Sequence, residues 1–228
     1  MSASTTHPSV LKHHFDNLEQ QHSAERLGMW MFLATEVLFF AGLFGSYTIY
    51  RLYYPAEFEI GSHKLNQLYA TINTVLLVTS SLTMTFAIRS AKLGDRTNLV
   101  RFLLVTAALG TGFMVVKGFE YAQDFEEGLL PGKYFSHELK DEVAGKGFDP
   151  TKVQLFLCFY YIMTGIHGIH LIIGIGCVLW LVGEAKLGRI PPENYSTVDV
   201  VSLYWHLVDA IWLFLMPLLY LASGAHIH

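Results

Sequence analysis

Five separate segments of this sequence are each apolar enough and long enough to cross a lipid bilayer, and this constrains the fold more than any other feature. They lie at about residues 27–51, 68–91, 99–121, 153–182 and 198–222. A hydrocarbon core roughly 30 Å thick requires about 20 helical residues. Because lipid offers backbone groups no partner outside their own segment, each segment is predicted to be a helix. The predicted fold class is therefore all-α: a polytopic membrane protein with five transmembrane helices.

The composition agrees with this fold and limits the possible partners. Only 15% of the residues are charged, whereas soluble domains contain about 25%. The formal net charge of −4 gives no support for nucleic-acid binding, which favours a basic surface. We expect a polar N-terminal arm at residues 1–26, one membrane domain at 27–222, and a short tail at 223–228.

The orientation in the membrane is predicted from the density of basic residues in the short loops. The loop between the second and third segments carries Arg89, Lys92, Arg96 and Arg101. Cytoplasmic loops are enriched in Lys and Arg, so this loop and the N-terminus are predicted to be cytoplasmic. The long segment at 122–152, rich in acidic residues, then lies outside. We expect it to be irregular, with about one helical turn.

Ionisable residues at membrane depth are the candidate functional residues. Glu36 lies within the run MWMFLATEVLFFAGLFGSY, His167 and His170 lie within TGIHGIHLIIG, and His206 and Asp209 lie within YWHLVD. Glu36 and His206 are nine and eight residues from the predicted cytoplasmic end of their helices, which corresponds to about 12–14 Å at ~1.5 Å per residue. Intramembrane ionisable groups usually face the bundle interior and pair with one another. The sequence therefore predicts a buried polar cluster in which three helices meet around Glu36.

Four interpretations of this cluster remain open from the residues alone. Glu36 could belong to a proton relay, although a relay needs a chain of polar groups and one cluster is visible. Two histidines could be axial ligands of a haem, or the three histidines and Glu36 could bind a metal ion. Alternatively, Glu36 bonds a histidine and fixes the helix packing. Small residues that allow close helix approach favour this structural interpretation: Gly165, Gly168, Gly174 and Gly176.

A second polar pair lies near the predicted external end of the third segment. Lys117 and Glu120 are three residues apart, which places them on one face of a helix. We expect an ion pair near the interface, with the Lys117 side chain extending along the helix toward the headgroups.

Five motifs resemble, in chain order, those of subunit III of the haem-copper oxidases. They are RLGMWMFLATEVLFFAGLFGSY, NTVLLVTSSLTM, KGFEYAQDF, TGIHGIHLIIG and YWHLVDAIWLFLMPLLYL. The resemblance covers about residues 26–222 and includes all five predicted helices. The last two motifs are the most specific. The mitochondrial members of this family have seven helices, so this chain resembles the five-helix bacterial form.

The resemblance implies a non-catalytic subunit of a terminal oxidase that reduces oxygen to water and pumps protons. Such a subunit stabilises subunit I, supports its proton uptake and binds phospholipid. The implied partners are subunit I, subunit II, further respiratory subunits and membrane lipids, in a bacterial plasma (inner) membrane. The implied alternatives are subunit III of a quinol oxidase and the related accessory subunit of a nitric oxide reductase.

The resemblance also changes the interpretation of the polar residues. In this family the haems and copper belong to the partner subunits, so we expect no cofactor, metal ligand or catalytic residue in this chain. Glu36 falls where the family has a buried carboxylate, and His167 and His170 match its paired histidines. The structural interpretation of Glu36, bonded to histidine, is therefore favoured, with a secondary role in proton movement left open.

Overall fold

The chain is almost entirely helical over residues 18–191 and 195–221, which the computed structural model describes. Its elements are α1 (Leu18–Tyr53), α2 (Pro55–Lys64), α3 (Gln67–Lys92), α4 (Arg96–Glu126), the 3₁₀ turn η1 (Gly132–Tyr134), α5 (His137–Gly145), α6 (Pro150–Lys186) and α7 (Ser196–Tyr220). In the described part, five helices are long and apolar enough to cross a membrane: α1, α3, α4, α6 and α7. The predicted all-α fold with five spans is confirmed. Most of the predicted N-terminal arm and the tail at 223–228 lie outside the described residues.

The helices are longer than the apolar segments predicted. Helix α1 is already helical at Leu18, before the predicted start at residue 27, and α6 runs from Pro150 to Lys186 rather than over 153–182. Hydropathy marks only the part of a helix that lies in lipid, whereas capping side chains mark its ends. The carboxylate of Asp149 accepts a hydrogen bond from the Thr151 amide at the start of α6 (2.8 Å). The polar ends of these helices therefore extend beyond the apolar spans.

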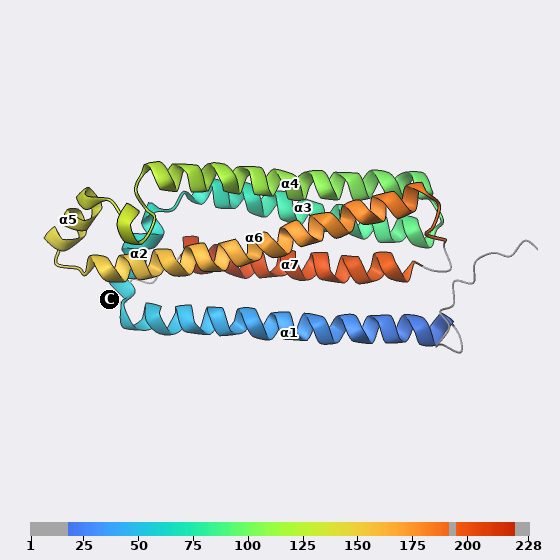
Figure 1. Cartoon of the computed structure of the whole chain (residues 1–228), viewed down its shortest axis with the longest axis horizontal. Helices are drawn as coiled ribbons and strands as arrows, with labels where there is room; N and C mark the ends of the chain where they lie inside the picture. The colour runs from blue at the N-terminus through green and yellow to red at the C-terminus, as the bar shows by residue number, and fades with distance from the viewer. Residues whose placement is uncertain (1–17, 192–194, 222–228) are drawn as a thin grey trace, which may run out of the picture.

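At one end of the molecule, the short helix α2 was not predicted, and α5 is longer than the single helical turn that was expected. Helix α2 lies in the connection between the first two spans, and α5 lies in the segment expected to be irregular (Figure 1). Phe58 of α2 is fully buried against the rings of Tyr47 and Phe156. The Lys64 ammonium of α2 lies 3.2 Å from the Glu142 carboxylate of α5. This end of the molecule, which we call the α2–α5 end, is therefore a folded cap.

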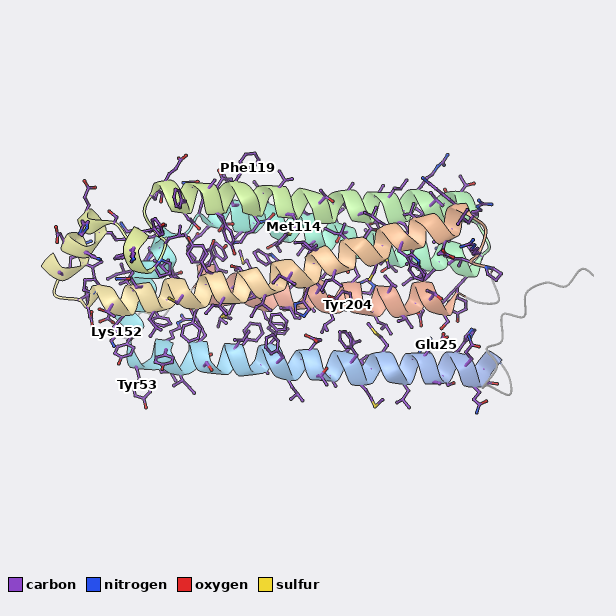
Figure 2. All side chains as sticks on the ribbon, viewed as in Figure 1. Glu25, Tyr53, Met114, Phe119, Lys152 and Tyr204 are labelled. Atoms are coloured by element: carbon purple, nitrogen blue, oxygen red, sulfur yellow. The ribbon has the colours of Figure 1, made fainter. Side chains whose placement is uncertain are left out.

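Helix α7 lies at the centre of the bundle and α1 lies along its side. In the most apolar 18-residue stretch of α7, 56% of the residues are buried, whereas in that of α1 only 11% are buried. Helices α3, α4, α6 and α7 pack together, and α1 contacts the bundle mainly through α7 (Figure 1). Side chains, including Tyr204, fill the space between α1 and the bundle (Figure 2). Much of α1 is thus available to lipid or to another subunit.

The C-terminal end of α7 is held by side chains of three other helices. The last carbonyl groups of a helix have no partner within it, and leaving them unpaired in an apolar environment is costly. Three consecutive carbonyls accept hydrogen bonds: Leu218 from the Tyr47 hydroxyl (2.9 Å), Leu219 from the Ser62 hydroxyl (2.8 Å) and Tyr220 from the Gln67 amide (3.0 Å). The end of α7 is therefore fixed to α1, α2 and α3.

Two glycines allow a tryptophan to enter the centre of the bundle. Trp205 of α7 is fully buried, and a Cβ atom on Gly110 or Gly174 would lie 2.7 Å or 3.2 Å from its ring. In contrast, a Cβ atom on Gly165 or Gly176 would meet nothing within 4 Å. The prediction that the glycines of α6 serve close packing therefore holds for Gly174 but is wrong for Gly165 and Gly176.

Candidate functional site

Glu36 of α1 bonds directly to His170 of α6. The Glu36 Oε2 atom lies 3.0 Å from His170 Nε2, and the two side chains are 19% and 18% exposed. The other ring nitrogen, Nδ1, lies 2.8 Å from the Ile166 carbonyl, so it must donate a proton to that bond. The Nε2 atom then either accepts a proton from a neutral Glu36 or donates one to its carboxylate. In both forms the pair is electrically neutral overall, which reduces the cost of placing it in lipid.

His206 does not take part in this contact, which corrects the prediction that three helices meet around Glu36. Its Nδ1 atom lies 2.8 Å from the Ser81 hydroxyl of α3. Residues at equal depth in the membrane can point in different directions. The position of His206 along α7 does not define which neighbouring helix its side chain contacts. Among the described residues, the hydrogen bond of Glu36 joins α1 to α6 alone.

His167 points into the bundle core, whereas His170, three residues later in α6, points toward Glu36. Its side chain is 1% exposed and its ring lies between those of Phe113 (5.6 Å between centroids) and Trp212 (5.4 Å). Neither ring nitrogen has a hydrogen-bond partner among the described residues. The three histidines therefore face three different environments. Within residues 18–191 and 195–221, no three His, Cys, Asp or Glu side chains are grouped as a metal site would require.

Asp209 is the fifth member of the predicted cluster, and it lies apart from Glu36. It is 5% exposed, and neither carboxyl oxygen has a hydrogen-bond partner in the described part of the chain. The hydroxyl of the adjacent Ser81 is bonded to His206. Asp209 lines a groove between α3 and α7 with a volume of about 430 Å³.

Lys117 and Glu120 form the predicted ion pair, with 3.0 Å between the ammonium and the carboxylate, and the pair is buried inside the bundle. Lys117 is 5% exposed and Glu120 is 0% exposed. The ammonium also donates to the hydroxyls of Tyr160 (3.0 Å) and Tyr220 (2.7 Å). The prediction that Lys117 extends toward the headgroups is therefore wrong, because these tyrosines supply partners inside the bundle.

The cluster around Lys117 contains groups that sequence reasoning missed. The Tyr160 hydroxyl lies 2.9 Å from Glu120 and 3.1 Å from Asp124, and the Tyr220 hydroxyl donates to Glu120. Asp124 follows Glu120 by four residues, so its place on the same helix face could have been recognised. No local pattern indicates the two tyrosines, because they come from α6 and α7. The cluster joins α4, α6 and α7.

Comparison of the sequence with known proteins defines the family. The model of the family described as cytochrome c oxidase subunit III matches residues 11–126 and 149–224. The chain belongs to the cytochrome c oxidase subunit III family. A probable cytochrome c oxidase subunit 3 of Nocardia farcinica is 30% identical over 207 residues, which are 89% of this chain and 92% of that protein.

Relatives in this family include both bacterial and animal proteins. The cytochrome c oxidase subunit 3 of Corynebacterium diphtheriae is 30% identical, over 85% of this chain and 86% of its own length. That of Loxodonta africana is also 30% identical, but the match covers only 68% of its length. Family membership confirms the resemblance seen in the five motifs. It identifies the chain as a multi-pass membrane subunit of an oxidase complex.

Proposed function

We propose that this chain is a non-catalytic subunit III of a haem-copper terminal oxidase and that the redox centres lie in its partner subunits. The observation that carries the proposal is the engagement of Glu36, His170 and His206 in contacts between helices. Both nitrogens of His170 are bonded within the chain, to Glu36 and to the Ile166 carbonyl. His206 is bonded to Ser81 across the α3–α7 contact. These side chains hold helices together, which suits a subunit that supports a catalytic partner.

Bound phospholipid is part of the proposal. Two grooves run between α1 and α7, with volumes of about 590 and 220 Å³. Their walls are almost entirely apolar, formed by residues such as Val37, Leu38, Phe44 and Leu207. Acyl chains fit such surfaces because they carry no groups that need hydrogen bonds. Lipid in these grooves would support α1, which has few contacts of its own.

A supporting role in proton uptake by subunit I is also proposed. The Glu36–His170 pair holds a proton between two groups that can exchange it, and both side chains are partly exposed at the edge of the bundle. Intramembrane carboxyl and imidazole groups are typical of proton-transfer routes. The pair is therefore the part of this chain that we expect to exchange protons, with the N-terminus on the cytoplasmic side.

Purification of the complex tests this function. The chain is tagged at its N-terminus and purified in mild detergent from native membranes, and a reduced-minus-oxidised visible spectrum and a copper analysis are recorded. Both are repeated after the tagged chain is dissociated from its partners. Haem and copper in the complex, with neither in the isolated chain, are expected. Haem retained by the isolated chain would overturn the proposal.

The same preparation separates the related complexes. Oxygen consumption with reduced cytochrome c, compared with oxygen consumption with a quinol, identifies the electron donor. A large haem subunit without copper, together with nitric oxide reduction, would identify the chain as the accessory subunit of a nitric oxide reductase.

A further inference from the structure

The groove between α3 and α7 contains a buried carboxyl group without a partner. Asp209 lies near the middle of the 25-residue helix α7, and both of its oxygens are buried and unbonded within the described residues. A buried polar atom without a hydrogen bond costs about 1–3 kcal/mol. Because Asp209 lines the groove, a donor from outside the chain can reach it there.

Each of the other polar residues of the groove has at least one hydrogen bond. The Ser81 hydroxyl is bonded to His206, and the Thr85 hydroxyl donates to the carbonyl of Ser81 in its own helix (3.0 Å). The remaining lining residues are apolar. The Ser81 hydroxyl has one proton and can serve at most one of the two Asp209 oxygens, so Asp209 is the group in this groove that still has an oxygen open to an outside hydrogen-bond donor.

The shape and surroundings of the groove suit a helix. It opens on the outer side of the bundle, since Val78, Leu82 and Leu213 on its walls are 50%, 55% and 48% exposed. Small residues on both helices, such as Ser81 and Ala210, let another helix backbone approach closely. A lipid acyl chain could cover the apolar walls, but it has no donor for Asp209, and a headgroup does not reach the centre of the membrane.

We propose that the α3–α7 groove is the docking site for a transmembrane helix of a partner subunit, and that this helix places a side-chain N–H or O–H donor against the Asp209 carboxyl. The inference rests on the proposed function, because it requires the chain to be part of a membrane complex. It adds to that function the face of the bundle and the residue that recognise the partner.

Photo-crosslinking in the intact tagged complex tests the occupant of the groove. Benzoylphenylalanine is introduced in place of Leu82 or Leu213, at the groove, or in place of Phe119, which is 64% exposed and points outward from α4 (Figure 2). We expect Leu82 and Leu213 to give adducts with the same membrane-spanning segment of one partner subunit, mapped by mass spectrometry. Lipid adducts alone at both positions would overturn the proposal.

Substitutions of Asp209 test the hydrogen bond. Asp209→Leu removes an unpaired polar group from the isolated chain, so the chain is expected to fold normally while its affinity for the partner falls about tenfold or more. Asp209→Asn retains an acceptor and is expected to bind within about threefold of the native chain. Thr85→Val is the matched control, because the Thr85 hydroxyl is bonded within its own helix. Undiminished recovery of the partner with Asp209→Leu would contradict the proposal.

The donor found by crosslinking supplies a further check. When the partner residue that supplies this donor is replaced by an apolar residue, the double variant with Asp209→Leu is expected to lose little more affinity than Asp209→Leu alone, since both substitutions remove the same hydrogen bond. If Asp209→Leu does not accumulate, the crosslinks obtained in the native background decide the question. If the complex contains haem and copper but the groove positions give only lipid adducts, this inference is rejected and the proposed function stands. If no haem subunits are present in the complex, the proposed function is rejected.

Discussion

Glu36 is tolerated in the membrane because His170 faces it, and substitutions should show how much the pair contributes. Glu36→Gln retains a donor for His170 Nε2, so we expect a loss of about 1 kcal/mol or less in the free energy of unfolding. Glu36→Leu leaves that nitrogen unpaired and should cost about 1–3 kcal/mol. Unfolding titrations in SDS-containing mixed micelles measure both. Glu36→Gln should leave assembly and oxygen reduction largely intact, and complete loss of turnover in an assembled complex would contradict the structural interpretation.

Lys117 neutralises buried acidic groups, so its removal should be far more damaging than removal of an exposed lysine. Lys117→Met leaves Glu120 and Asp124 without their cation in a site with little solvent, and breaking a buried pair in this way costs about 3–5 kcal/mol. Lys64→Met is the control, because Lys64 pairs with Glu142 at the surface and such pairs contribute about 1 kcal/mol or less. Equal effects in the same unfolding titration would show that the Lys117 cluster is not a major source of stability.

The sequence reveals which polar residues are costly but not all of their partners. Glu36 could be recognised because a carboxyl in an apolar run needs a partner, and the partner expected was a histidine. The direction of His206 could not be predicted, because it depends on how α7 is rotated against α3. Lys117 was misjudged for a related reason: the hydroxyls that bind it come from distant parts of the chain.

At the scale of helices, Gly110 and Gly174 should resist substitution while Gly165 should not. Alanine at Gly110 or Gly174 would press against the buried Trp205 ring, and overpacking of this kind costs about 1–3 kcal/mol. Gly165→Ala meets open space on the same helix as Gly174 and should change the free energy of unfolding by about 0.5 kcal/mol or less. A comparable loss for Gly165→Ala would indicate that helix flexibility, rather than contact with Trp205, makes these glycines necessary.

The contact between α2 and α5 should depend on pH. Hydrogen bonds from Lys146 and Lys64 hold the pKa of the Glu142 carboxyl below its usual value. A depressed folded-state pKa means that the contact stabilises the cap at neutral pH and is lost as the pH falls through that value. Hydrogen exchange of the α5 amides should therefore increase at acidic pH, after correction for the intrinsic rate. Glu142→Gln should remove this pH dependence, and an unchanged dependence would assign it to another group.

The elements differ in how well the sequence predicts them. The five spans are evident because about 20 consecutive apolar residues have few alternative structures. Helices α2 and α5 are short and mostly polar, so their stability comes from tertiary contacts such as that of Phe58 with Tyr47 and Phe156. Such contacts are not visible in local periodicity.

The whole molecule has a dense central bundle and a peripheral first span, and this division indicates where other components bind. Lipid is proposed for the grooves beside α1, and a partner helix is proposed for the groove beside Asp209. The α1–α7 and α3–α7 grooves adjoin along α7, since His206 lines one groove of each kind. A subunit with this arrangement would connect its partner to the lipid through a single central helix.

The orientation of the whole molecule gives the last prediction. The short connection between α3 and α4 concentrates basic residues, whereas those at the α2–α5 end are spread over long segments rich in acidic residues. The orientation of a membrane protein depends on the density of Lys and Arg near the ends of its spans, so the α2–α5 end should lie outside. Thr97 and Glu138 are exposed at opposite ends and can be tested singly as Thr97→Cys and Glu138→Cys, after Cys158 and Cys177 are replaced by alanine.

A membrane-impermeant maleimide then distinguishes the two orientations. In spheroplasts, whose outer face is accessible, the Glu138→Cys variant should be labelled and the Thr97→Cys variant should not. In inside-out vesicles the pattern should reverse, because the α3–α4 connection is then accessible. Labelling of the Thr97→Cys variant in spheroplasts would place the N-terminal end of α1 outside. It would also show that the long acidic segment, rather than the basic loop, determines how this chain inserts.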